Sequence, residues 1–287
     1  MSIERHDMKK PVTIKNILIF AILTLTSAFF LIPLAWVLAS SLRPAGSLYE
    51  YANPLTWKTF FPANITLENY RKIFVDLLFG RAILNSLFVS ISTVFFGVLV
   101  SSMAGFALAK FRFRGRQLIF VIVLVTFMVP FESIVIPLYV LVRGIGLENS
   151  YAALILPGVG NGLGIFLFKQ FFEEVPNELL EAARMDRASW FRIYAQILLP
   201  LCMPAIATVV VMTFMFQWNS LFWPLVATHS SRFEVVQVAV AANRMSEDTS
   251  WANLFSAAIA GSLPPVVVFL FLQKYFIQGI SGTGLKT

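Results

Sequence analysis

Six segments of this chain are long and apolar enough to cross a lipid bilayer as helices, which takes about 20 residues each. They cover approximately residues 16–40, 81–109, 117–142, 150–172, 200–228 and 253–272. Each is too continuous for a barrel strand, in which polar and apolar residues would alternate over about ten residues. The sequence therefore predicts an all-α polytopic membrane protein, with a six-helix transmembrane domain over residues 16–272.

Composition supports a membrane location and argues against several kinds of chemistry. Hydrophobic residues make up 58% of the chain and charged residues 13%, whereas a soluble domain has about 45–50% and about 25%. The first apolar run exceeds the roughly 7–15 residues of a signal-peptide core, so we expect it to remain as a helix. With a single cysteine, Cys202, and two histidines, no metal site and no catalytic residue is expected in this chain.

The distribution of Lys and Arg predicts the orientation in the membrane, because these residues concentrate in cytoplasmic connections. Most of the 22 Lys and Arg residues lie on the side that holds the N-terminal segment, 1–15, and the C-terminal tail, 273–287. Both termini are therefore expected in the cytoplasm, and the longer loops at 41–80 and 229–252 outside. This topology in membrane lipid explains the net charge of +7 better than binding to nucleic acid does.

One charged stretch, "NELLEAARMDRASWFRIYAQILLP", interrupts the apolar sequence on the expected cytoplasmic side. Asn177 and the acids after it are typical of a helix start, and Ser189 suits the cap of a second helix. Such an elbow, at 177–199, could rest on lipid headgroups, where basic residues would be preferred. Its acidic residues and paired alanines instead favour docking into a cleft of a cytosolic protein.

The elbow also resembles a known signature. "EAARMDRAS" followed by "IYAQILLP" is similar to the EAA motif of permease subunits in binding-protein-dependent ABC importers. The carbohydrate-type branch of that family is resembled by further stretches: "LENY", "LNSLFVS", "MVPFESIVIPLYVL", "GLENSYAALIL", "FQWNSLFWPL" and "QGISGTGLKT". The arrangement as a whole is most similar to the second membrane subunit of maltose-type transporters.

This resemblance implies a type I ABC importer permease fold, in which the elbow is a coupling helix that docks on an ATP-binding subunit. By matching position, the contact would be formed by Glu181, Ala182, Ala183 and Asp186. Arg187 stands where the family usually has glycine, a residue that commonly adopts a left-handed conformation after a helix. Either the turn closes differently here, or Arg187 makes a charge contact of its own.

The resemblance further implies partners: a homologous second permease, two ATP-binding subunits, an extracytoplasmic solute-binding protein and a sugar or sugar-like solute. A bacterial plasma (inner) membrane is the implied location. The Walker A pattern, G-x-x-x-x-G-K-[ST], does not occur in the sequence. ATP and Mg²⁺ are therefore expected on the separate ATP-binding subunit, and this chain is not expected to be an enzyme.

A few polar side chains fall inside or near the predicted spans and are candidates for the path of the solute. Intramembrane polar residues line pathways in many transporters, although hydrogen bonding between helices or to carbonyls freed by proline is an alternative for each. The candidates are Glu132, Asn85, Asn161, Trp218 and Asn219. Two other functions stay open: an ion-coupled secondary transporter that uses Glu132, and an ABC importer permease for a non-sugar solute such as a phosphorylated polyol.

Overall fold

The computed structural model describes residues 14–47, 56–62, 64–245 and 250–283, and every regular element in these ranges is helical. The all-α prediction is confirmed. Of the expected N-terminal segment, 1–15, only the last two residues are described, and they open the first helix. The elements are α1 (Ile14–Ser41), η1 (Trp57–Thr59), α2 (Glu68–Arg71), η2 (Lys72–Asp76), α3 (Phe79–Lys110), α4 (Arg116–Met128), α5 (Phe131–Gly144), α6 (Tyr151–Val159), α7 (Gly162–Glu174), α8 (Asn177–Met185), α9 (Trp190–Ile193), η3 (Tyr194–Leu198), α10 (Leu199–Leu201), α11 (Met203–Trp218), α12 (Phe222–Ala227), η4 (Ser231–Phe233), α13 (Val236–Met245) and α14 (Trp251–Thr283).

The chain divides into two units, of which the smaller comprises residues 1–72 together with Ser250–Ile259. Within this unit, side chains satisfy the carbonyls at the end of α1, which lack partners inside their own helix. Asn69 Nδ2 donates to the carbonyl oxygens of Ser41 (2.9 Å) and Arg43 (2.6 Å), and Ser256 Oγ donates to that of Ser41 (3.0 Å). The segment around Asn69 is thereby attached to the end of α1.

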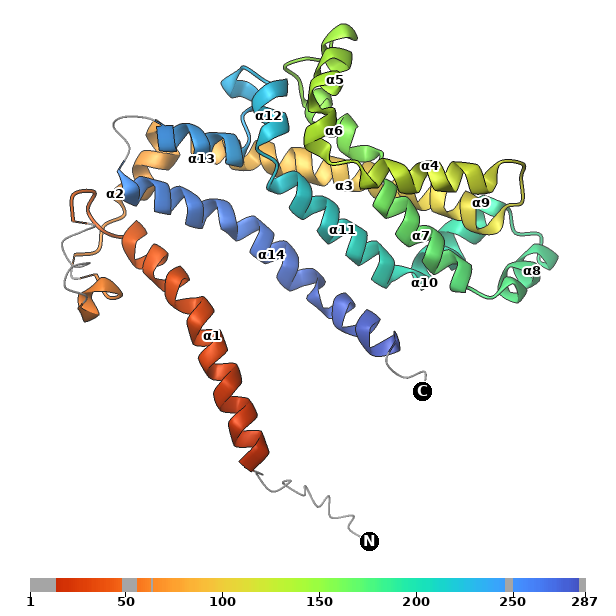
Figure 1. Ribbon diagram of the computed structural model, residues 1–287, viewed down its shortest axis with the longest axis horizontal. Helices are drawn as coiled ribbons and strands as arrows, with labels where there is room; N and C mark the ends of the chain where they lie inside the picture. Colours follow the sequence, from red (N-terminus) through yellow and green to blue (C-terminus); the bar gives the residue numbers. More distant parts are fainter. Residues whose placement is uncertain (1–13, 48–55, 63, 246–249, 284–287) are drawn as a thin grey trace. The chain divides into compact units, whose positions relative to one another are not determined.

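The larger unit, Ile73–Thr249 with Ala260–Thr287, is built around α3. This helix packs most extensively against α7 and also contacts α6, α11 and α13 (Figure 1). Small residues allow the close approach, as is usual between membrane helices. An ideal Cβ added at Gly105 of α3 would lie 2.7 Å from Phe168 Cβ of α7, so only glycine fits there without movement.

The segment at 117–142 is not one straight span, because it consists of α4 and α5 with a bend of 102° between them (Figure 1). Pro130 lies between the two helices. Proline lacks an N–H and disfavours helical geometry in the residue before it, here Val129, which is extended. Pro130 therefore accounts for the bend in a segment that the sequence predicts as a single helix.

A second predicted span is also bent. A bend of 80° at Cys202 separates α9–α10 from α11, and α11 ends at Trp218, well before the end of the predicted span at 200–228. Four helical segments of the described chain are long and apolar enough to cross a membrane, and six are if each bent pair counts as one span. α14 runs on to Thr283 and so takes in most of the expected tail at 273–287.

Candidate functional site

The charged stretch forms two helices joined by a tight turn, α8 and α9. Glu178 lies in the first turn of α8, where a carboxylate favours the positive end of the helix. Ser189 begins α9, and its hydroxyl oxygen accepts the N–H of Arg192 (3.2 Å). Each helix therefore starts with its own local signal in the sequence.

The turn after α8 is closed by a left-handed residue, Arg187, with φ of 57°. The N–H of Arg187 donates to the carbonyl of Arg184 (3.0 Å), and the N–H of Ala188 donates to that of Ala183 (3.0 Å). These are the two hydrogen bonds of a Schellman motif. The turn therefore does not close differently from that of the family: it keeps the left-handed geometry that glycine would adopt, with arginine in a sterically unfavourable conformation.

We predict that Arg187→Gly raises the free energy of unfolding by about 1 kcal/mol, because relief of a steric cost of about 1–2 kcal/mol exceeds the added chain entropy of glycine. Thermal unfolding of the protein in detergent would measure this. Ala182→Gly, in the helical interior of α8, is the matched control and should be destabilising by about 1 kcal/mol. A lower melting temperature for Arg187→Gly would contradict the left-handed turn.

The two faces of α8 differ in exposure. Glu181, Ala182 and Asp186 are exposed, as docking on a partner requires. Leu180 is buried, and Ala183 is partly buried against the same hydrophobic cluster. Of the four residues expected in the contact, Ala183 is therefore the one turned toward the protein itself, as the helical period of about 3.6 residues requires.

One residue of the exposed face was missed in the sequence. Met185 has 84% of its surface exposed and lies four residues after Glu181, one helical turn along the same face. Its polarizable, flexible side chain suits an adaptable protein contact. The four-residue spacing between Glu181 and Met185 could have indicated a shared helix face, but the charges and alanines of the motif are the stronger pattern.

The inner face of α8 is attached to a cluster of large side chains from α3, α7, α9 and η3. The cluster includes Phe106, Phe168, Phe172, Leu180, Ile193 and Tyr194. The hydroxyl groups of Tyr194 and Ser102 of α3 are hydrogen bonded at 2.7 Å in its interior. The guanidinium of Arg184 lies 5.0 Å from the ring centre of Trp190, and this contact closes the elbow.

The candidates for the solute path separate into exposed and buried groups. Glu132 is exposed in the first turn of α5, immediately after the bend, where the helix dipole favours a carboxylate. Asn219 is exposed at the end of α11, where its Nδ2 donates to the carbonyl of Met215 (2.8 Å) and its Oδ1 lies 3.5 Å from Gln237 Nε2. These two are the candidates with exposed side chains.

Asn85 of α3 lies inside the protein and holds the loop that precedes α13. Its Nδ2 donates to the carbonyl oxygens of Arg232 (3.0 Å) and Glu234 (2.8 Å), which uses both amide hydrogens. Its Oδ1 accepts the hydroxyl of Tyr151 (2.8 Å). The geometry gives this side chain a role in positioning the loop.

Asn161 caps α7 at the break between α6 and α7. Its Oδ1 accepts the N–H of Gly164 (3.1 Å), and its Nδ2 lies 3.5 Å from Thr213 Oγ1 of α11. The glycine-rich stretch around it, at 157–164, also brings helices close together: an added Cβ at Gly158 would lie 2.6 Å from Thr93 Cγ2. The stretch therefore allows α6 to approach α3 closely.

Trp218 is buried, and its indole satisfies a carbonyl that a proline leaves unpaired. Proline at position i cannot donate to the carbonyl at i−4, so Pro265 in α14 frees the carbonyl of Gly261. The indole Nε1 of Trp218 donates to this oxygen at 3.1 Å. Trp223 of α12 makes the same kind of contact with α6. Pro157 frees the carbonyl of Ala153, and the indole Nε1 of Trp223 donates to this oxygen at 2.9 Å.

We predict that Trp223→Phe lowers the free energy of unfolding by about 1–3 kcal/mol, because it leaves the buried carbonyl of Ala153 without a donor. Pro157→Ala restores an N–H at the position that pairs with this carbonyl. In that background Trp223→Phe should be markedly less destabilising. Unfolding in detergent of the unchanged protein, the two single variants and the double variant measures the coupling between the two positions. Equal destabilisation in both backgrounds would show that the indole does not act through this carbonyl.

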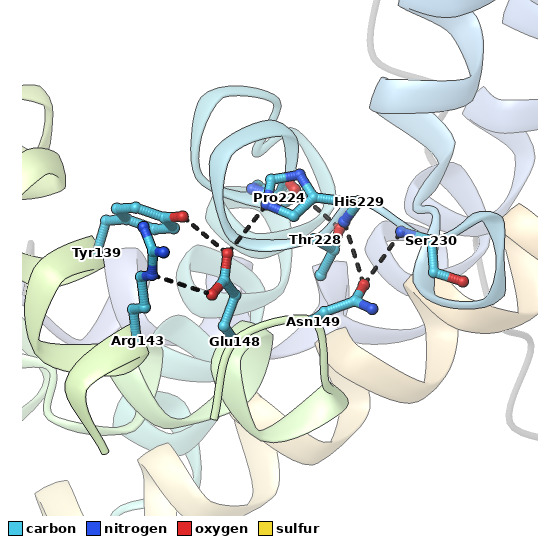
Figure 2. Close-up of polar contacts among 8 residues, drawn as sticks. All are labelled: Tyr139, Arg143, Glu148, Asn149, Pro224, Thr228, His229 and Ser230. Atoms are coloured by element: carbon cyan, nitrogen blue, oxygen red, sulfur yellow. Dashed lines mark hydrogen bonds and ion pairs between the residues drawn. The ribbon is translucent and has the colours of Figure 1, made fainter. Parts of the chain in front are cut away.

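A polar cluster joins the loop after α5 to the loop after α12, as Figure 2 shows. Glu148 Oε1 accepts the hydroxyl of Tyr139 (2.7 Å) and lies 3.1 Å from His229 Nε2, while Arg143 Nε lies 3.7 Å from Oε2. The hydrogen bonds from Tyr139 and His229 hold the pKa of Glu148 below its usual range. Its contribution to stability is therefore present at neutral pH and lost as the pH falls through this lowered pKa.

Asn149 completes this cluster (Figure 2). It adopts a left-handed conformation, with φ of 57°, which asparagine tolerates better than most residues. Its Oδ1 accepts the N–H groups of His229 (3.1 Å) and Ser230 (3.0 Å), and its own N–H donates to the carbonyl of Ala227 (2.9 Å). Glu148 and Asn149 thus have a structural role that local sequence patterns did not reveal.

The fold and the elbow define a class of membrane transport protein, and comparison with known proteins identifies the family. Residues 97–282 match the family model described as "Binding-protein-dependent transport system inner membrane component". The chain belongs to this family, and the resemblance stated from its motifs is confirmed. It is a multi-pass membrane protein whose family works with a solute-binding protein.

Its relatives include permease proteins of sugar and sn-glycerol-3-phosphate transport systems. The arabinooligosaccharides transport system permease protein AraQ of Halalkalibacterium halodurans is 33% identical over 93% of this chain and 94% of the relative. The sn-glycerol-3-phosphate transport system permease protein UgpE of Brucella melitensis is 33% identical over 78% and 83%. The trehalose transport system permease protein SugB of Mycobacterium tuberculosis is 30% identical over 92% and 95%.

Among solved structures, a bacterial ABC transporter involved in the import of the acidic polysaccharide alginate has the same fold. A chain of that transporter superposes with a TM-score of 0.77 over 96% of this chain and 99% of its own length, at 23% identity. A second structure of the alginate transporter, in complex with an alginate pentasaccharide-bound periplasmic protein, gives a TM-score of 0.62 at 19% identity, over 90% and 93%. The ABC importer permease fold is thereby confirmed.

Proposed function

We propose that this chain is the transmembrane permease subunit of an ATP-driven importer for a sugar or sugar-like solute in a bacterial inner membrane. The observation that carries the proposal is the match to the arabinooligosaccharide permease AraQ, which extends over almost the whole of both chains. The similarity to the trehalose permease SugB over 92% of this chain supports a carbohydrate as the solute.

The permease works in a complex with several partners. A homologous second permease pairs with this chain, so that the solute passes between them, and a solute-binding protein delivers it from outside. Two separate ATP-binding subunits hold ATP and Mg²⁺ and hydrolyse the nucleotide. The exposed face of α8, formed by Glu181, Ala182, Met185 and Asp186, docks on one of them, and the left-handed turn at Arg187 sets the angle at which it does so.

Transport follows from two states of this complex. ATP binding closes the ATP-binding subunits, draws the coupling helices together and opens the cavity to the outside. Hydrolysis and product release return it to the inward-facing state, so the nucleotide acts through its different affinity for the two states. This chain breaks no bond itself. Glu132 and Asn219, with their exposed side chains, remain the candidates for contact with the solute.

A phosphorylated polyol is the second candidate for the solute. The similarity to sn-glycerol-3-phosphate permeases supports it, but that match covers 78% of the chain against 93% for the arabinooligosaccharide permease. The ion-coupled secondary transporter that uses Glu132 is not favoured, since the family is binding-protein-dependent and the carboxylate lies exposed at a helix start.

The test is transport by the whole complex, purified with its partners and reconstituted in proteoliposomes. Radiolabelled arabinotriose, trehalose and sn-glycerol-3-phosphate are the probes, each presented on the binding protein. We expect uptake of a sugar that needs ATP and persists when ionophores collapse the ion gradients. Uptake that survives without ATP and stops with the ionophores would contradict the importer, and uptake of sn-glycerol-3-phosphate alone would replace the solute class.

A further inference from the structure

Lys110, the last residue of α3, contacts the junction between α7 and α8. Its Nζ donates to the carbonyl oxygen of Val175 (2.7 Å) and to Asn177 Oδ1 (3.0 Å). Val175 follows the last residue of α7, and Asn177 is the first residue of α8. One ammonium group thus holds both sides of the junction at Pro176 from a third helix.

The helical hydrogen-bond ladder is interrupted at this junction. Pro176 has no N–H, so α7 cannot continue through it, and Val175 has an extended conformation. On its α7 side the chain is held firmly, because Glu173 pairs with Lys169 (2.7 Å) of the same helix and with Arg116 (3.1 Å) of α4. Beyond the proline, α8 depends on contacts with other elements.

The contact that Lys110 makes is strong for its kind. Hydrogen bonds from a charged donor are shorter and stronger than neutral ones, and both distances lie in or near that range. Lys110 is only partly exposed, which reduces the screening of its charge by water.

We propose that Lys110 is a positioning residue that ties the coupling helix α8 to α3, so that a displacement of α8 is passed to the helix at the centre of the larger unit. The inference rests on the proposed docking of α8 on an ATP-binding subunit. α3 contacts α6, α7, α11 and α13, so its movement reaches most of that unit. Leu180 joins α8 to a hydrophobic cluster that also contains Phe106 of α3, but hydrophobic contacts are non-directional, whereas the hydrogen bonds of Lys110 have a fixed geometry.

The test uses nucleotide alone, so the solute need not be known. Spin labels are placed on single cysteines in the complex with its ATP-binding subunits, at Leu179→Cys on α8 and at Arg81→Cys at the opposite end of α3. Both native side chains are exposed, whereas the thiol of Cys202 is buried and remains unlabelled. The change in the spectrum on adding ATP and orthovanadate is measured at each label.

In the otherwise unchanged chain, both labels should respond. Lys110→Met keeps the apolar stem and removes the ammonium, so the response at Leu179→Cys should persist. The response at Arg81→Cys should fall about tenfold, because hydrogen bonds to a charged group shift an equilibrium by at least that factor. Lys110→Arg should restore the response, and Arg112→Met, which removes an exposed charge two residues further on, should leave it unchanged.

A full response at Arg81→Cys in the Lys110→Met chain would overturn the inference and leave the proposed function standing. The absence of any response at Leu179→Cys in the unchanged chain would overturn both. If Lys110→Met does not assemble, Asn177→Ala removes one acceptor and leaves Lys110 in place. This variant should reduce the response at Arg81→Cys severalfold, and an undiminished response would equally refute the role of Lys110.

Discussion

Glu181→Lys is expected to abolish transport while leaving insertion into the membrane intact. Glu181 is exposed on the free face of α8, so the change disturbs no packing within this chain. Once docked, the carboxylate would be buried against a basic residue of the ATP-binding subunit. Reversing the charge of one partner in a buried pair is destabilising by about 3–5 kcal/mol, since an uncompensated charge remains in the interface. Binding would then weaken by more than about a hundredfold.

Co-purification of the ATP-binding subunit with the tagged permease measures the effect, together with ATP-dependent uptake in proteoliposomes. Glu174→Lys is the matched control, because Glu174 is an exposed acid at the end of α7 and lies outside α8. The control should bind its partner and transport normally. Normal co-purification and uptake by Glu181→Lys would refute the assignment of α8 as the coupling helix.

Gly105→Ala should destabilise the protein through the contact between α3 and α7. An added Cβ would lie 2.7 Å from Phe168 Cβ, 2.9 Å from Lys169 N and 3.1 Å from the carbonyl carbon of Phe168. Two of these atoms belong to the backbone, so the whole helix must move to make room. Overpacking of this kind is destabilising by about 1–3 kcal/mol. The same displacement would shift Lys110, five residues further along α3.

Thermal unfolding in detergent would show this as a lower melting temperature. Gly97→Ala in the same helix is the control, since its Cβ would meet the nearest atoms at 3.8 Å, an ordinary contact distance. Alanine also has a higher helix propensity than glycine, by about 1 kcal/mol, so this control should be neutral or stabilising. A melting temperature of Gly105→Ala equal to that of Gly97→Ala would contradict the close packing.

The candidate site was predictable where its signals are local. The start of α8 at Pro176, the hydroxyl cap at Ser189 and the acids on the elbow all follow from hydrogen bonding and charge within a few residues. These features depend little on what surrounds them. The left-handed turn is different, because arginine stands where the motif usually has glycine and its conformation is known only from the structure.

The polar residues of the spans were predictable only as alternatives. A tryptophan or asparagine in an apolar segment can serve a solute or satisfy the protein, and its own sequence context does not distinguish the two. In the structure Trp218 donates to a carbonyl freed by Pro265, more than forty positions away, and Asn85 donates to carbonyls about 150 positions away. These hydrogen bonds join residues far apart in the sequence, so a local sequence pattern cannot predict them.

The sequence by itself determined that this chain is a helical membrane protein with an acidic elbow, because hydropathy and charge decide which segments enter lipid and which stay in water. Tertiary structure alone decided which face of α8 is free, which turned Ala183 inward and left Met185 exposed. It also decided where Lys110 holds the elbow. The physical reason is that helix faces and unpaired carbonyls acquire their partners only when distant helices pack together.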